Sequence, residues 1–307
     1  MPNPLHALTA PARRQIRTWV LGAFPRDPAR TLDYDAPAGD PGLFGPASAT
    51  WKVHADFPGM LAGGLCALML QTLHPLALAG VWDHSNFRTD LVGRLRRTTA
   101  FVAGTTYAAR EPASALIDKV RRIHGQVRGH AEDGRAYSAD DPALLTWVHV
   151  SEAYAFLAGY RRYAHAQLPA DAGDRYYGEV RRIAEALGAR EVPSTERDVE
   201  RYFERVRADL VFGERSRIVL GILAQVRLPV ALPGLSRDIF LGAGAALLPA
   251  WAQDQLQFTL RRRVQTRIAA RALATASPLV RAALPDGVGP RACRRMGVPA
   301  SVLRDWR

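Results

Sequence analysis

Apolar residues recur at helical spacing through most of the chain. The clearest stripe joins positions three and four apart: Ile117, Val120, Ile123, His124 and Val127. This spacing predicts an amphipathic helix through residues 118–129, with the His124 ring on the side that faces the interior. Basic side chains, Arg121 and Arg128 among them, project from the flanks of the same helix.

A second stripe follows a helix start. Either Asp140 or Asp141, which precede Pro142, is expected to cap the first turn of this helix. Its apolar face contains one histidine and one carboxylate: Leu144, Leu145, Val148, His149, Glu152 and Phe156.

Further helices are expected along the chain, separated by segments rich in proline and glycine. The predicted helices include residues 1–24, 91–109, 176–187 up to Gly188, a helix opened by Ser194-Thr195-Glu196, and 260–274. Residues 26–48 and 129–137 read as loops, and the last thirty residues as a loosely packed tail with short helices. Alternation of β-branched residues is almost absent, so an all-α fold is predicted, with one large multi-helix domain at residues 49–275 between segments 1–48 and 276–307.

Residues 57–82 contain no charged side chain, and this run is long enough to span a bilayer. Proline cannot donate to a helix and disfavours a helical residue before it, so His74-Pro75 predicts a break. Two buried core helices are therefore preferred to a membrane span.

The formal net charge of +12 comes mainly from arginine. The basic residues are spread over many helices, which argues against a nucleic-acid binder and leaves open a peripheral contact with a membrane surface. Cys66 and Cys293 form no disulfide or zinc pattern, which suits a reducing compartment, and a cytoplasmic location is expected. The oligomeric state is not fixed by the sequence.

Two clusters are candidates for chemistry. A neutral imidazole at His124 could bind an iron porphyrin whose carboxylates are neutralised by nearby arginines, or it could be an ordinary core histidine. Arg94, Arg97 and Thr98 share one helix face and could enter a pocket or lie at the surface. His149 is open to the same two readings. No Glu-x-x-His pair of a di-iron bundle is present.

The order and spacing of several motifs resemble the DUF2236 family, which includes MpaB-type oxygenases and latex-clearing rubber oxygenases. The matching motifs are Gln71-Thr-Leu-His74-Pro75, His84-Ser85, Gly93-Arg94-Leu-Arg-Arg97-Thr98, Val120-Arg-Arg-Ile-His124, Tyr137-Ser-Ala-Asp-Asp-Pro142 and Leu144-Leu-Thr-Trp-Val-His149. The resemblance covers roughly residues 50–250.

The resemblance implies an all-α fold around a b-type haem. In it, His124 matches the iron ligand, Arg94 and Thr98 match polar residues kept beside the haem, and His149 matches a histidine near the pocket. Arg97 falls where the rubber oxygenases place a lysine. Residues 76–82 have no carboxylate where those enzymes have a glutamate, so cleavage of polyisoprene is not expected.

Together these residues lead to the hypothesis of a haem-dependent oxygenase that uses dioxygen. His124 would hold the iron, and Arg94, Arg121 and Arg128 would pair with the haem carboxylates. Arg97, Thr98 and His149 would surround the bound dioxygen. Residues 57–82 and 218–249 would wall a slot for an apolar, isoprenoid or unsaturated-lipid substrate. The alternatives are a non-catalytic haem-binding protein and a haem-free lipid-binding protein.

Overall fold

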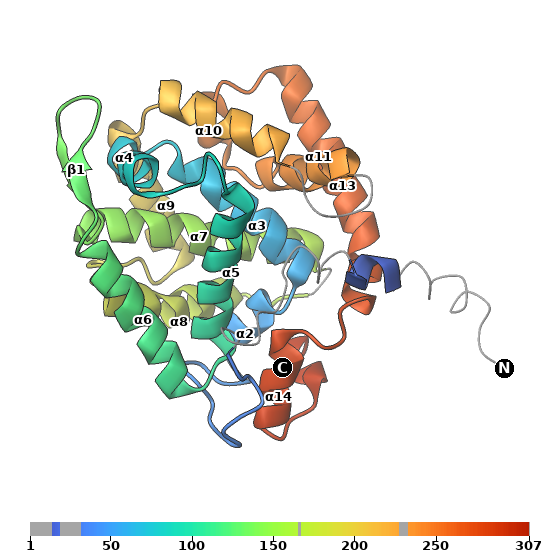
Figure 1. Cartoon of the computed structure of the whole chain (residues 1–307). Coiled ribbons are helices and arrows are strands. Elements are labelled where there is room, and N and C mark those ends of the chain that lie inside the picture. Colours follow the sequence, from blue (N-terminus) through green and yellow to red (C-terminus); the bar gives the residue numbers. More distant parts are fainter. Residues whose placement is uncertain (1–13, 19–31, 165–166, 227–232, 307) are drawn as a thin grey trace.

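The computed structural model describes residues 14–18, 32–164, 167–226 and 233–306, which fold almost wholly into α-helices (Figure 1). The first half of the chain forms α2 (Ala49–His54), α3 (Phe57–Gln71), α4 (Pro75–His84), α5 (Leu91–Tyr107), α6 (Arg110–His124), β1 (Arg128–His130) and β2 (Ala136–Ser138). The second half forms α7 (Pro142–Tyr163), α8 (Ala172–Leu187), α9 (Glu196–Val206), α10 (Glu214–Gln225), α11 (Pro233–Ala245), α12 (Ala250–Gln255), α13 (Leu260–Ala282) and α14 (Val288–Arg295). Short 3₁₀ turns follow α9 and α14. The predicted all-α fold is confirmed.

Helices α3 and α7 cross at the centre of the molecule (Figure 1). Their backbones approach closely because glycines occupy the crossing. A Cβ atom on Gly159 would lie 2.3 Å from the carbonyl oxygen of Gly59, and one on Gly63 would lie 2.7 Å from that of Ala155. Only glycine fits at these two positions, because any side chain would collide with the backbone of the other helix. The crossing therefore fixes the position of α7 against α3 at the centre of the fold.

Several helix ends lie where the sequence places them. Asp141 caps α7, its carboxylate accepting hydrogen bonds from the N–H groups of Ala143 at 2.8 Å and Leu144 at 3.2 Å. Thr195 caps α9, and α8 ends at Gly188, whose φ of 112° favours glycine. These helix ends depend on residues that are close in sequence, so the sequence alone predicts them.

The uncharged run from residue 57 divides into α3 and α4, as the His74-Pro75 break predicts. His74 caps α4, and the two helices are bent by 105° relative to each other. Among the described residues no single helix is long and apolar enough to cross a membrane. Helices α3 and α4 together have the length and composition of a membrane span. Most of α3 is buried inside the protein.

The helix predicted through residues 118–129 ends earlier, at His124. The following residues turn into β1, which pairs antiparallel with β2 in the register Arg128↔Ser138 and Gly129↔Tyr137, so the loop expected at 129–137 is a hairpin. The Tyr137 side chain holds it in place, because the ring is buried and the hydroxyl donates to Asp83 Oδ2 at 2.6 Å. Ile123, predicted on the buried stripe, is 49% exposed.

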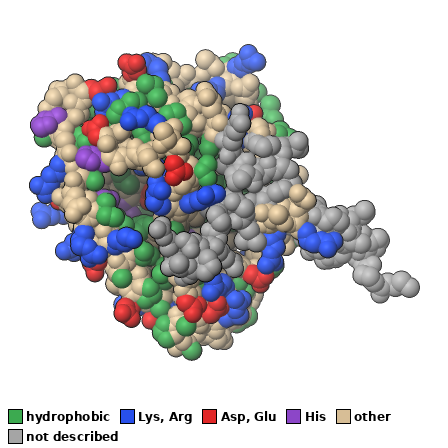
Figure 2. All heavy atoms as spheres, in the orientation of Figure 1, with side chains coloured by type: hydrophobic (Ala, Val, Ile, Leu, Met, Phe, Trp, Pro, Cys, Tyr) green, Lys and Arg blue, Asp and Glu red, His purple; other side chains and the backbone are tan. Residues whose placement is uncertain are grey.

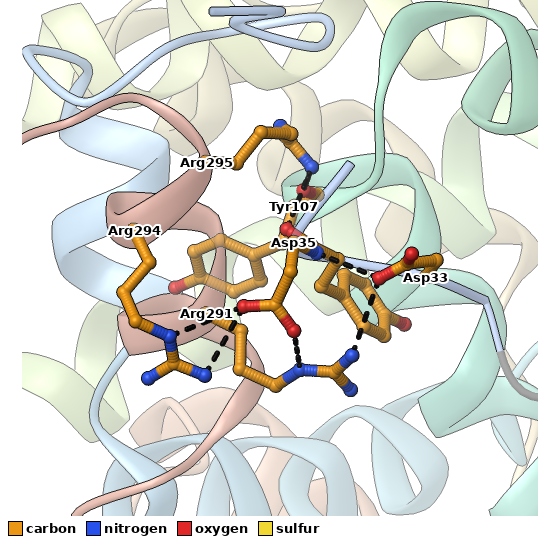
Figure 3. A network of polar contacts seen from close by, with 7 residues as sticks. Asp33, Asp35, Tyr107, Arg291, Arg294 and Arg295 are labelled. Atoms are coloured by element: carbon orange, nitrogen blue, oxygen red, sulfur yellow. Dashed lines mark hydrogen bonds and ion pairs between the residues drawn. The ribbon is translucent and has the colours of Figure 1, made fainter. Parts of the chain in front are cut away.

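The C-terminal segment is packed, contrary to the loose tail that was expected. Arg295 is 3% exposed and donates to the carbonyl oxygens of Tyr34, Asp40 and Tyr107 at 3.2, 2.8 and 2.8 Å. Figure 3 shows the neighbouring arginines of α14 pairing with the segment before α2: Arg291 with Asp33 and Asp35, and Arg294 with Asp35. Most of the helix predicted at residues 1–24 lies outside the described residues, and residues 14–18 are helical.

Candidate functional site

A hollow lies beside the N-terminal half of α5. Residues 97–100 of this helix are all exposed, and four consecutive residues cover the whole circumference of a helix. This turn is therefore only loosely covered by the described residues, whereas Gly104–Tyr107 at the other end are buried. Figure 2 shows a hollow on this face, with hydrophobic and histidine side chains in and beside it and basic side chains around it.

His124 stands at the last position of α6 and is half-buried. Its Nδ1 atom is enclosed and has no hydrogen-bond partner within the described part of the chain. Burial lowers the pKa of His124, against a weaker opposing effect of the Asp140 carboxylate. The imidazole is therefore neutral at physiological pH, which is the form that binds a metal ion.

Helix α7 contributes His149 and Glu152, which lie on one face three residues apart. Both are deep inside the protein and yet keep part of their surface accessible. Burial lowers the pKa of His149 to about 4, so this ring is neutral as well. Burial also raises the pKa of Glu152 to about 7, and it outweighs the hydrogen bond from Gln71 and the positive charge of Arg94.

Arg94 of α5 interacts electrostatically with this carboxylate. Its side chain is largely buried, and Nη1 donates to Ser85 Oγ at 3.0 Å. Burial lowers the pKa of Arg94, while the carboxylate of Glu152 opposes that effect. Three helices that lie far apart in sequence, α3, α5 and α7, thus bring Gln71, Arg94 and Glu152 together.

The other predicted site residues lie at the surface. Arg97 is exposed and donates to Asn86 Oδ1 at 3.0 Å, and its Nη1 lies 3.6 Å from Asp90 Oδ2. Thr98 and Arg121 are exposed, and Arg128 pairs with Asp140 at 3.7 Å. Arg97 nevertheless lies close enough to Arg94 for its positive charge to contribute to lowering the Arg94 pKa. The roles of all four residues stay predictions.

Glu152 is the residue whose role the sequence analysis missed. The pattern placed it on the same face as His149, and a carboxylate on an otherwise apolar face was the available signal. A further buried histidine, His54 of α2, has a structural role. Its ring nitrogens bond Thr106 Oγ1 at 2.8 Å and Tyr176 Oη at 2.9 Å, and burial lowers its pKa to about 3.

A pocket of about 250 Å³ lies between α3, α10, α11 and α13, and its lining combines apolar side chains with Asp238, Arg262, Gln265 and Thr266. Its apolar lining includes Met69, Leu220, Leu223, Leu241 and Ala245. Residues 220–245 contribute to this pocket together with Met69 of α3, and its role as a substrate slot stays a prediction.

The model of a family described as "ER-bound oxygenase mpaB/B'/Rubber oxygenase, catalytic domain" matches residues 51–277. No curated protein and no solved structure matches the chain.

Proposed function

The chain belongs to the family of mpaB and rubber oxygenase catalytic domains, and from this premise we propose that it is a haem b-dependent oxygenase. The proposed substrates are dioxygen and an apolar small molecule. The observation that carries the proposal is the enclosed Nδ1 atom of His124, which has no hydrogen-bond partner among the described residues.

The residues present fit a haem group. A buried ring nitrogen without a hydrogen-bond partner destabilises the folded protein, and Nδ1 of His124 is such an atom. Binding to an iron ion would give this imidazole a partner. In the proposal, His124 holds the iron, and Arg94, Arg121 and Arg128 are the candidates to pair with the haem carboxylates. When bound, the haem supplies the oxygen chemistry, whereas the protein supplies binding, orientation and charge.

Glu152 is proposed to accept and release a proton during the reaction. With a pKa of about 7 its carboxyl group is close to half protonated at neutral pH, so it can both accept and release a proton. Gln71 orients this carboxyl group by its hydrogen bond, and Arg94 places a fixed positive charge beside it. Residues 76–82 lack a carboxylate, and α7 provides one from a different part of the fold.

The apolar part of the pocket between α3, α10, α11 and α13 supports an apolar substrate. Each methylene group that such a pocket buries contributes ~0.8 kcal/mol, so isoprenoid or unsaturated-lipid chains can be selected with few polar contacts. The side chains that provide this surface include Leu220, Leu223 and Leu241.

An absorption spectrum of the purified protein, oxidised and then reduced with and without carbon monoxide, tests the haem. We expect a Soret band in the parent protein and in a His84→Ala control, whose exposed ring lies on α4. We expect His124→Ala to lose stoichiometric haem, and His149→Ala to retain it.

Full haem loading of His124→Ala would show that another residue holds the iron. Loss in His149→Ala alone would move the ligand to α7. A colourless parent protein, expressed with added haem precursor, would favour the lipid-binding alternative. Oxygen consumption with an unsaturated lipid or terpenoid then separates an oxygenase from a haem carrier.

A further inference from the structure

The outer face of α13 carries an exposed apolar stripe. Leu260, Val264 and Ile268 are 78%, 45% and 61% exposed and lie four residues apart, so they form one row along the helix. The opposite face is buried through Thr266 and Leu273. Single exposed apolar residues are common, but a row of three on one helix is a contiguous surface that requires an explanation.

Arginines border this row on both sides. Helical geometry places Arg267 and Arg271 along one edge of the stripe and Arg261 along the other, and all three are exposed. The combination of an apolar row with flanking guanidinium groups is typical of helices that lie in the interface of an anionic membrane. It differs from a solvated helix face, on which the row would be polar.

A basic pocket of about 280 Å³ opens along the Arg267 edge. Its lining contains no carboxylate: Arg162, Ala246, Gln253, Arg263, Thr266, Arg267 and Arg271. Arg263 forms an ion pair with Asp254, so one of the four arginines is neutralised. Three guanidinium groups and two neutral polar side chains then converge on a space large enough for a phosphate group.

We propose that α13 docks this protein on an anionic phospholipid membrane, with the apolar row among the acyl chains and a lipid phosphate in the arginine pocket. The charge of the surface favours this occupant over a second copy of the chain, because two such arginine-rich faces would repel each other. The surface is carried by residues other than those of the hollow and does not depend on the proposed oxygenase activity.

Sedimentation of the full chain with sucrose-loaded vesicles tests the proposal. We expect binding to phosphatidylcholine vesicles that contain phosphatidylglycerol, little binding to phosphatidylcholine alone, and weaker binding at high salt. Removing two of the three pocket charges other than Arg263, by Arg267→Gln with Arg271→Gln, should weaken partitioning roughly thirtyfold. Leu260→Ser with Ile268→Ser should weaken it roughly tenfold, because the acyl contact is lost.

The matched control is Arg190→Gln with Arg197→Gln. It removes the same net charge from exposed positions elsewhere and should bind as the parent protein does. Circular dichroism of each variant checks that the fold is intact. An equal loss of vesicle binding in the control would show that binding depends on net charge alone, and this would overturn the proposal.

Three other results would also overturn it: no binding to anionic vesicles, calorimetric binding of inorganic phosphate without any vesicle binding, or a dimer that disappears in the Leu260→Ser, Ile268→Ser variant while vesicles are not bound. The last result would assign the stripe to self-association.

Discussion

At the scale of single residues, Glu152 is a carboxyl group placed where its charged form is disfavoured. It lies deep in the protein on a helix face shared with His149, and a hydrogen bond from Gln71 together with the charge of Arg94 offsets only part of the desolvation. Such a group is retained at a cost to stability, which is typical of residues that act on protons. The cost itself can be measured.

The first prediction concerns the pH dependence of stability. In the unfolded chain Glu152 releases its proton near its ordinary pKa of 4.5, whereas in the folded protein the pKa is about 7. The folded state therefore holds the proton more tightly. The resulting stabilisation is complete below pH ~4.5 and is lost as the pH rises through ~7. Glu152→Gln has no such titration, so the free energy of unfolding of the parent relative to the variant should fall by on the order of 3 kcal/mol across this range.

Urea unfolding of both proteins at a series of pH values gives this difference directly. His54 and His149 titrate in parent and variant alike and cancel in the comparison. A difference that stays constant between pH ~4.5 and ~8 would show that Glu152 has an ordinary pKa, and its proposed role as proton holder would then be withdrawn.

Residue patterns predicted some single positions well and others not at all. The caps at Asp141 and Thr195 follow from hydrogen bonds to residues two or three positions away, and such signals are present in the local sequence. Ile123 fits the same helical stripe as His124, yet it is 49% exposed. Which part of a stripe is covered depends on neighbouring elements, and here the helix ends one residue after Ile123.

At the scale of elements, the hairpin after α6 shows why a helix end was misplaced. The residues of β1 were read as a continuation of the helix and a loop, because three-residue strands carry almost no periodicity. The contact that stabilises the hairpin, from Tyr137 to Asp83, joins residues 54 positions apart. A window along the sequence cannot contain such a contact.

Helix α5 leads to a prediction about dynamics. Its first half borders the hollow and is exposed at residues 97–100, while its last turn is buried. If haem fills the hollow, it covers this part of α5, and the backbone hydrogen bonds of the helix should open less often. We expect hydrogen exchange at residues 97–103 to slow by roughly tenfold or more when haem is bound, and the central amides of α7 to change little.

Exchange measured by mass spectrometry on the haem-loaded and haem-depleted protein provides the comparison. His124→Ala, incubated with haem, is the control and should exchange in α5 as the haem-depleted protein does. Unchanged exchange in α5 on haem binding to the parent would place the haem elsewhere in the fold.

At the scale of the whole molecule, the C-terminal helix α14 packs against the segment that precedes α2 and against the end of α5. Arg295 of α14 reaches carbonyl oxygens of Tyr34, Asp40 and Tyr107, and the last of these is the C-terminal residue of α5. The sequence could not reveal this, because an arginine in an arginine-rich tail looks solvated and carbonyl acceptors have no sequence signature. The described part of the C-terminal segment thereby holds the buried end of the helix that borders the hollow.

The final prediction compares two adjacent arginines of α14. Arg295→Ala would leave three carbonyl groups without their donor at a site that is 3% exposed, so the free energy of unfolding should fall by about 3 kcal/mol. Arg294, whose side chain is 56% exposed, pairs with Asp35 at the surface, and Arg294→Ala should cost less than about 1 kcal/mol. Urea unfolding measures both. Equal losses in the two variants would mean that surface ion pairs, rather than the buried guanidinium, hold the C-terminal segment against α5.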